Sequence, residues 1–251
     1  MDSSQLERYA RHILLKEIGG SGQSRLANAQ ITMIGAGGLG SVALYYLVAA
    51  GVGKIQIVDS DIVSLSNLQR QILFRNSDLG EKKVFAAKKN LLQLNPLVEI
   101  SVWDELFCLE NSSRIITQSD LIIDGTDNFK SKALICKVAY EHKIPLIYGG
   151  LSQWEGQVCL FDPNLPSACF DCIYPNGPNQ NMEENCLDLG IIGPTVGVIG
   201  SLMAGEAIKF ITSAGKPLVD QILTYDCLHG EFRSFQVEKR EDCPVCSQKF
   251  G

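Results

Sequence analysis

The chain has 251 residues, 45% of them hydrophobic, and a formal net charge of −6. A composition this apolar supplies a full hydrophobic core and excludes an extensively disordered chain, and the negative charge argues against a nucleic-acid-binding protein, which normally has a basic surface. The polar first 20 residues do not resemble a signal peptide, and the most apolar stretch, 189–211, is interrupted by Pro194, Glu206 and Lys209. We therefore expect a cytoplasmic protein that neither binds nucleic acid nor crosses a membrane.

The N-terminal segment predicts two short helices. Residues 2–18 have the pattern of an amphipathic helix and a turn, with Arg11 on its polar side, and residues 23–29 predict a second helix. A flexible joint is expected between them, made of Gly19, Gly20 and Gly22.

Residues 31–59 have the pattern of a nucleotide-binding β-α-β unit. An apolar strand, a GxGxxG turn, an apolar helix and a second strand follow one another and end at Asp59. Gly35 suits the sharp turn because glycine adopts positive φ freely, and Gly38 lacks a Cβ, so a phosphate can approach the backbone where the helix begins. Asp59 follows the last glycine by about 20 residues, where a carboxylate meets a ribose. The alternative is a glycine turn in an α/β core that binds no ligand.

The next segments alternate between helix and strand patterns. Helices are predicted at 81–94, 109–118 and 128–142, and strands at 98–103, 121–123 and 146–148. This alternation predicts an α/β fold, Rossmann-like, with a mostly parallel sheet and helices on both faces.

The pattern changes near residue 150. The strand-like segments 222–225 and 233–237 leave no room for a helix between them, so antiparallel pairing is expected there. A third strand is predicted at 157–162, an exposed mobile loop at 174–185 and a helix at 194–211. We predict one domain over 1–251, with a nucleotide-binding half at 1–150 and a mixed or antiparallel half at 151–251.

Two cations follow the β-α-β unit. Asn67 and Arg70 are three residues apart, so one helical turn could present both, and Lys83 follows. Arg70 and Lys83 could hold phosphate oxygens. Taken alone, the same residues also fit a solvated surface.

Asp127 lies just beyond a buried strand that ends at Asp124. Ligands of open α/β sheets bind outside the carboxyl ends of the strands, so Asp127 is a candidate Mg²⁺ ligand beside the nucleotide phosphates. The alternative, which does not exclude the first, is a helix N-cap for the run that starts at Asn128.

The cysteines fall into three groups. Two CxxC pairs can supply four thiolates to one structural, tetrahedral Zn²⁺, and the alternatives are redox pairs or unrelated buried thiols. These pairs are Cys169 with Cys172 and Cys243 with Cys246. Four more are expected in the core, namely Cys108, Cys136, Cys159 and Cys227. Cys186 lies in the predicted loop and is a candidate nucleophile, although no histidine accompanies it.

Taken together, these motifs resemble the ThiF/MoeB/HesA family, the bacterial relatives of ubiquitin-activating enzymes. The resemblance extends over nearly the whole chain. It is carried by segments 8–11 (RYAR), 35–40 (GAGGLG), 59–61 (DSD), 66–71 (SNLQRQ), 126–128 (TDN), 193–194 (GP) and the two CxxC pairs.

The resemblance implies an enzyme that uses Mg-ATP to adenylate the C-terminal Gly-Gly carboxylate of a ubiquitin-like sulfur carrier, with release of pyrophosphate. The nucleotide ligands that it implies are Gly38, Asp59, Asp61, Asn67, Arg70, Gln71 and Lys83. Asp127 would hold Mg²⁺, the half at 151–251 would bind the carrier and Zn²⁺, and Arg11 would reach the triphosphate of the neighbouring subunit in a homodimer. Such chemistry depends on positioning and charge neutralisation, which Arg11, Arg70, Lys83 and Mg²⁺ would supply.

The branch within the family is a separate question. Cys186 and the segment 190–194 favour ThiF, whose carrier serves thiamine synthesis and whose cysteine bonds to the carrier's terminal sulfur. MoeB, which serves molybdopterin synthesis, is the alternative. No rhodanese-like domain follows Cys246, so a separate sulfur donor protein is expected.

Two other classes compete with this interpretation. An NAD-dependent oxidoreductase fits the glycine turn and Asp59 but gives no purpose to Arg70, Lys83 or the second CxxC pair. A non-catalytic scaffold would lack the ATP residues, which are present here.

Overall fold

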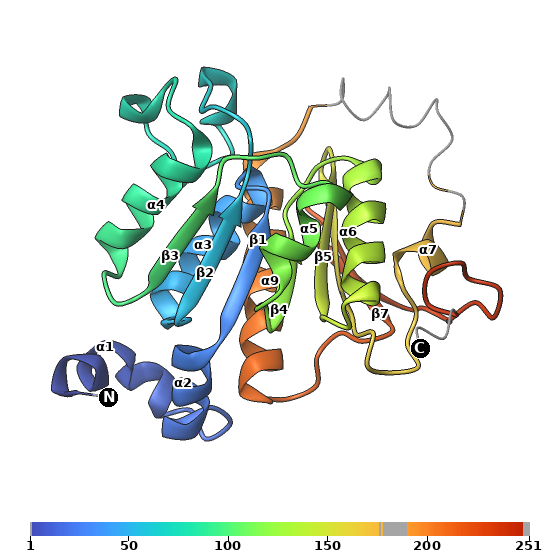
Figure 1. Ribbon diagram of the computed structural model, residues 1–251, viewed down its shortest axis with the longest axis horizontal. Coiled ribbons are helices and arrows are strands. Elements are labelled where there is room, and N and C mark those ends of the chain that lie inside the picture. Colours follow the sequence, from blue (N-terminus) through green and yellow to red (C-terminus); the bar gives the residue numbers. More distant parts are fainter. Residues whose placement is uncertain (1, 176, 178–189, 248–251) are drawn as a thin grey trace.

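The computed structural model describes residues 2–175, 177 and 190–247. One eight-stranded sheet runs through it in the order β3-β2-β1-β4-β5-β6-β7-β8 (Figure 1). The strands from β3 to β5 are parallel, and β6, β7 and β8 continue the sheet in antiparallel pairs. The predicted mostly parallel sheet with an antiparallel continuation is therefore confirmed.

The opening unit forms as predicted. It consists of β1 (Gln30–Ile34), α3 (Gly38–Ala50) and β2 (Lys54–Val58). Gly35 has φ of +91°, and a Cβ there would lie 2.9 Å from the carbonyl carbon of Gly125. A Cβ at Gly40 would lie 2.1 Å from the carbonyl oxygen of Gly35. Gly35 requires glycine because the turn crosses the loop after β4 closely, and Gly40 requires it because the first turn of α3 packs against the glycine turn itself.

The other elements of the parallel part agree with the predictions within a few residues. They are α4 (Lys83–Leu94), β3 (Glu99–Trp103), α5 (Leu109–Ile116), β4 (Leu121–Asp124), α6 (Phe129–Glu141) and β5 (Leu146–Ser152). β5 is longer than predicted and runs through residue 150 without a break, because it pairs with β6 along its whole length.

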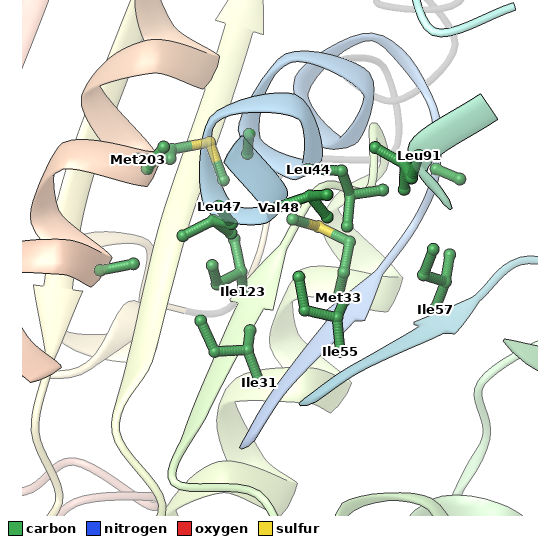
Figure 2. Packing of buried hydrophobic residues seen from close by; sticks show 14 of the residues in the cluster. Ile31, Met33, Leu44, Leu47, Val48, Ile55, Ile57, Leu91, Ile123 and Met203 are labelled. Atoms are coloured by element: carbon green, nitrogen blue, oxygen red, sulfur yellow. The ribbon is translucent and has the colours of Figure 1, made fainter. Parts of the chain in front are cut away.

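The helices form two layers. Figure 1 shows α5 and α6 on one face of the sheet and α3 and α9 (Gly193–Thr212) on the other. Figure 2 shows Leu44, Leu47 and Val48 of α3 packed over β1, β2 and β4, with Met203 of α9 beside them. β1 is buried on both faces because helices cover both, as is typical of a parallel sheet.

α9 is long and apolar enough to cross a membrane by length and composition alone. Half of its most apolar window is buried in this fold, where it packs against α3, β5 and β6. It is therefore a core helix, as the sequence predicted.

The predicted glycine joint near the N-terminus is wrong. α1 covers Ser3–Ile13, and the glycines at 19, 20 and 22 belong to α2 (Gly19–Asn28). Gly22 packs against Ile18 and Thr212, and Leu26 is fully buried, so tertiary contacts hold a helix that the glycines alone would disfavour. α1 lies at the amino-terminal edge of the sheet (Figure 1).

The antiparallel part consists of β6 (Glu155–Phe161), β7 (Gln221–Asp226) and β8 (Glu231–Gln236), as predicted. Three short elements complete the described chain, namely η1 (Leu65–Asn67), η2 (Asn76–Asp78) and α7 (Phe170–Ile173). Most of the predicted loop at 174–185, with Cys186 after it, lies outside the described residues.

Candidate active site

A cavity of about 1330 Å³ lies beyond the carboxyl ends of the parallel strands. One side is formed by the glycine turn, the end of β2 and the start of α4, and the other by the loop after β4 and by β5 to β8. Seven of the predicted nucleotide and magnesium residues line it, namely Gly38, Asp59, Asp61, Arg70, Gln71, Lys83 and Asp127.

Asp59 connects the glycine turn to the loop after β2. The N–H of Ala36 donates to its Oδ2 and the N–H of Asp61 to its Oδ1, both at 2.8 Å. Burial raises the pKa of Asp59, although the nearby Lys83 charge and these two N–H donors oppose the shift. Each carboxylate oxygen keeps a lone pair for a second donor, so the residue can accept a ribose hydroxyl.

Lys83 begins α4 and points into the same side of the cavity. Its Nζ lies 2.8 Å from Oδ2 of Asp61. The Lys83 side chain is only 6% exposed, whereas that of Asp61 is 67% exposed. The Lys83 ammonium can therefore exchange Asp61 for a phosphate oxygen. Because the Asp61 carboxylate is exposed to water, this exchange does not leave a buried carboxylate unpaired.

The phosphate end of the cavity contains unused hydrogen-bonding capacity. α3 starts at Gly38 with no side-chain cap, so its first N–H groups and its positive end face the cavity. The Oε1 atom of Gln71 is buried and has no hydrogen-bond partner within the described part of the chain. Space beside Gly37 and an uncapped helix start fit a triphosphate, and Gln71 Oε1 could accept from a bound hydroxyl or water.

Arg70 and Asn67 differ in position despite their spacing. Arg70 lines the cavity, and its Nη1 donates to the Ser66 carbonyl at 3.1 Å. Asn67 is not among the lining residues, and its Oδ1 instead accepts from the Ser64 N–H at 3.4 Å at the start of η1. The structure therefore brings Arg70 to the site and uses Asn67 to shape the turn before it.

Asp127 is exposed and lines the cavity. The alternative role of helix N-cap is wrong, because Asn128 caps α6 with its Oδ1, which accepts from the Ser131 N–H at 2.8 Å. The carboxylate of Asp127 remains a candidate ligand for a hard cation beside phosphates.

The sequence analysis missed a buried pair at the floor of the cavity. Lys132 Nζ lies 3.4 Å from Asp124 Oδ2 and donates to the Gly149 carbonyl at 2.6 Å. It also lies 4.9 Å from the centre of the Tyr148 ring. Asp124 was considered only as a strand end and Lys132 only as part of a helix, and the one available signal was a lysine at a core-facing position of that helix.

Aromatic side chains line the second half of the cavity. Gln157 donates to the hydroxyl of Tyr148 at 2.8 Å and also contacts the hydroxyl of Tyr174. Burial, with the neighbouring Tyr174 and Asp124, raises the pKa of Tyr148 well above its ordinary value. Tyr148 is therefore a neutral hydroxyl at physiological pH.

Arg11 lies outside the cavity of its own chain. The preceding turn of α1 is attached to the amino-terminal edge of the sheet, where Arg8 donates to the Leu94 carbonyl at 3.1 Å and Asn95 donates to the Tyr9 hydroxyl at 2.9 Å. The carboxyl ends of the strands lie at the opposite edge, so Arg11 is remote from the cavity of its own chain.

The four predicted cysteine ligands come together. The Sγ distances are 3.9 Å for Cys169–Cys172, 3.4 Å for Cys169–Cys243 and 3.4 Å for Cys172–Cys246. Four thiolates at about 2.3 Å from one tetrahedral metal would lie about 3.8 Å apart, so the cluster could hold a metal ion. The backbone N–H of Arg240 also donates to Cys172 Sγ at 3.4 Å.

Comparison with known proteins gives close relatives along the whole chain. Residues 9–245 match the ThiF family. The sulfur carrier protein adenylyltransferase of Thermus thermophilus is 40% identical over 249 residues, which cover 98% of this chain and 92% of the relative. The sulfur carrier protein ThiS adenylyltransferase of Escherichia coli is 35% identical over 246 residues, 98% of this chain and 97% of the relative.

Solved structures share the fold. E. coli MccB, crystallised with MccA-N7isoASN, superimposes with a TM-score of 0.85 at 22% sequence identity, over 98% of this chain and 76% of MccB. This likeness concerns the arrangement of the sheet and its helices.

Proposed function

The chain belongs to the ThiF family, and on that premise we propose that it is an adenylyltransferase for a ubiquitin-like sulfur carrier protein. The carrier's C-terminal Gly-Gly carboxylate attacks the α-phosphorus of ATP, the bond to the bridging oxygen breaks, and pyrophosphate leaves. The observation that carries the proposal is one cavity that contains an uncapped helix start, Asp59, Arg70, Lys83 and Asp127.

Each residue has a task in this reaction. Asp59 holds the ribose, the glycine turn and α3 receive the phosphates, and Arg70 and Lys83 neutralise charge that develops on the leaving pyrophosphate. A carboxylate is already a nucleophile, so no strong base is needed. The site works by positioning two anions and offsetting their repulsion.

The residues fit two metal ions with different tasks. Asp127 would hold Mg²⁺, which neutralises phosphate charge when bound. The four cysteines would hold Zn²⁺ with no open position, so that ion is structural and fixes the segment 243–246 against α7.

The proposal includes a homodimer in which Arg11 of one subunit reaches the triphosphate in the other. It is supported by the position of Arg11, which is exposed and remote from its own cavity. We place the enzyme in the cytoplasm, where its cysteines stay reduced.

The carrier that we favour is ThiS-type, for thiamine synthesis, because the ThiS adenylyltransferase matches over nearly the full length of both chains. A MoaD-type carrier for molybdopterin synthesis is the alternative. A separate protein would donate the sulfur. If the donor carries its sulfur as a cysteine persulfide, the persulfide attacks the acyl-adenylate and AMP leaves. The Cys186 thiolate would then attack the carrier-bound sulfur of the resulting acyl disulfide and displace the donor's cysteine thiolate.

The direct test is carrier-dependent exchange of labelled pyrophosphate into ATP, with purified ThiS-type and MoaD-type carriers compared. Arg70→Ala should lose about 2–4 kcal/mol of transition-state stabilisation, the effect of one preorganised donor. A carrier shortened by its last glycine is the matched control. Exchange at the wild-type rate by both Arg70→Ala and Asp127→Ala would place the site elsewhere, and NAD-dependent hydride transfer would favour the oxidoreductase alternative.

A further inference from the structure

The ion pair of Lys132 and Asp124 lies in the half of the cavity to which the adenylation chemistry above assigns Asp127 but no cationic side chain. The Lys132 and Asp124 side chains are 7% and 1% exposed, yet Lys132 lines the cavity. Burying two charges costs free energy even when they pair, so such a pair inside a binding site calls for a functional reason.

The two partners are satisfied to different degrees. Oδ1 of Asp124 accepts from the N–H of Thr126 at 2.9 Å and from its hydroxyl at 2.6 Å. Lys132 directs one N–H to the Gly149 carbonyl, but its distance of 3.4 Å to Asp124 is longer than the 2.7–2.9 Å or so of a strong charge-assisted bond. An ammonium has three donors, so Lys132 retains capacity for an anion in the cavity.

The position of Lys132 matches that of the second substrate. Asp59, Lys83 and the glycine turn take the nucleotide on the side of β1 and β2, and Asp127 follows β4. Lys132 stands five residues after Asp127, on the side of β4 and β5, so a group bound there lies across the cavity from Asp59 and Lys83.

The walls of this half suit a slender chain. Gly150 and Gly156 both line the cavity, and a Cβ at Gly150 would lie 2.5 Å from the Tyr148 hydroxyl. The other lining cation of this half, Arg233, is 65% exposed and pairs with Glu231. Lys132 is therefore the buried cation of the half of the cavity that Gly150 and Gly156 line.

We propose that Lys132 binds the C-terminal carboxylate of the carrier protein and aims it at the α-phosphorus. The inference rests on the proposed function and adds a residue that recognises the second substrate. Lys132 holds the oxygen that does not attack, while the other oxygen forms the acyl-phosphate bond and pyrophosphate leaves. Lys132 neither transfers a proton nor forms a covalent bond.

The test compares two forms of a ThiS-type carrier, one with its natural carboxylate and one with a C-terminal carboxamide. Calorimetry measures the Kd of each for the full-length protein in the presence of Mg²⁺ and a non-hydrolysable ATP analogue. The wild type should bind the carboxylate form about 10- to 100-fold more tightly, as expected for one charge-assisted contact. This preference is a binding readout that does not depend on turnover.

Three variants separate recognition from support. Lys132→Gln should reduce the preference to about onefold, whereas Asp124→Asn should retain it, because the cation remains. If the ion pair were merely structural, Lys132→Gln and Asp124→Asn would change the carboxylate preference by the same factor. Lys130→Gln, an exposed lysine two residues earlier on α6, is the matched control and should keep the wild-type preference.

Should Lys132→Gln fail to fold, the Asp124→Asn/Lys132→Gln double variant leaves neither charge buried and gives the same comparison. A carboxylate preference that survives in Lys132→Gln or in the double variant, or that is absent from the wild type, overturns the proposal. Wild-type pyrophosphate exchange without a carboxylate preference would remove Lys132 alone, whereas no exchange with any Gly-Gly carrier would remove the proposed function as well.

Discussion

The ammonium of Lys83 lies 2.8 Å from the carboxylate of Asp61, and only the carboxylate is well exposed. The pair therefore holds a buried cation at the nucleotide site until a stronger anion arrives. Lys83→Met should lower kcat/KM for ATP by about 100- to 1000-fold, the effect of one lost electrostatic contact in a preorganised site. Pyrophosphate exchange at varied ATP concentration measures it.

Lys88→Met is the matched control for Lys83→Met, since it removes the same charge from the same helix without touching the cavity. It should change kcat/KM less than twofold or so, as is usual for a surface substitution. Equal losses in the two variants would mean that the charge of α4, and not Lys83, supports the reaction.

A second prediction follows from the buried carboxylate of Asp59. Burial raises its pKa above the usual aspartate value of about 3.9, so it takes up a proton at a higher pH than exposed carboxylates do. Affinity for ATP should weaken as pH falls through that raised pKa, because the protonated acid accepts the ribose hydroxyls poorly. KM for ATP as a function of pH measures this.

The stability of the fold should change in the opposite direction over the same range. A folded-state pKa above the unfolded value means that the native state binds the proton more tightly, so this group destabilises the fold as pH rises through its folded pKa.

The control for the KM prediction is Asp59→Asn, which should give a high KM for ATP that does not vary with pH in this window. A wild-type KM profile as flat as that of the variant would contradict the assignment.

The in-trans role of Arg11 gives a third prediction. Arg11→Ala and Asp127→Ala should each lose most activity, since one removes a cation and the other a metal ligand. In a mixed dimer one of the two sites keeps both residues, so activity should return to about half of the wild-type value. Exchange assays on heterodimers verified by two different affinity tags measure it, and heterodimers that stay inactive would contradict a shared site.

The cysteine cluster gives a fourth prediction. Metal analysis should find about one zinc per chain, the number that four thiolate ligands predict. Cys243→Ser should abolish zinc binding and lower Tm by roughly 5–10 °C, or about 2–4 kcal/mol for a chain of this size. Cys227→Ser, which lies outside the cluster, should keep the zinc. A folded, active protein without metal would refute a structural zinc.

A fifth prediction concerns Cys186, which lies outside the described residues. Adenylation needs no thiol, so Cys186→Ser should leave pyrophosphate exchange within about twofold of wild type. If Cys186 bonds to the carrier, a covalent adduct formed with carrier, ATP and a sulfur donor should disappear in the variant. Non-reducing mass spectrometry detects the adduct, and equal thiocarboxylate production by both proteins would favour MoeB-type chemistry.

The parallel part of the fold was predictable because its signals are local. The GxGxxG turn and the alternation of apolar strands and helices each depend on residues close in sequence, and they recur in β1, α3 and β2. The start of α2 was not predictable in this way, since Gly22 is helical only because α9 and Ile18 pack against it. That contact joins residues almost 200 positions apart.

The place of a residue in the cavity was predictable where a motif fixes that place, as for Asp59 and Asp127. Sequence spacing failed for Asn67, whose side chain turns back to Ser64. Sequence spacing also could not identify the partners that keep Lys132 in the core, because they come from β4 and β5, the strands before and after its own helix. A polar residue in a helix reveals its role only once the neighbouring strands are placed.

The unbroken sheet has a consequence for how the protein unfolds. β5 passes through residue 150 and is hydrogen-bonded to β4 on one side and to β6 on the other. The described sheet therefore has no free edge between residues 1–150 and residues 151–251. These two halves should unfold together in a single cooperative transition. A fragment cut at 150 would end in the middle of β5 and leave unpaired backbone groups, which invite aggregation.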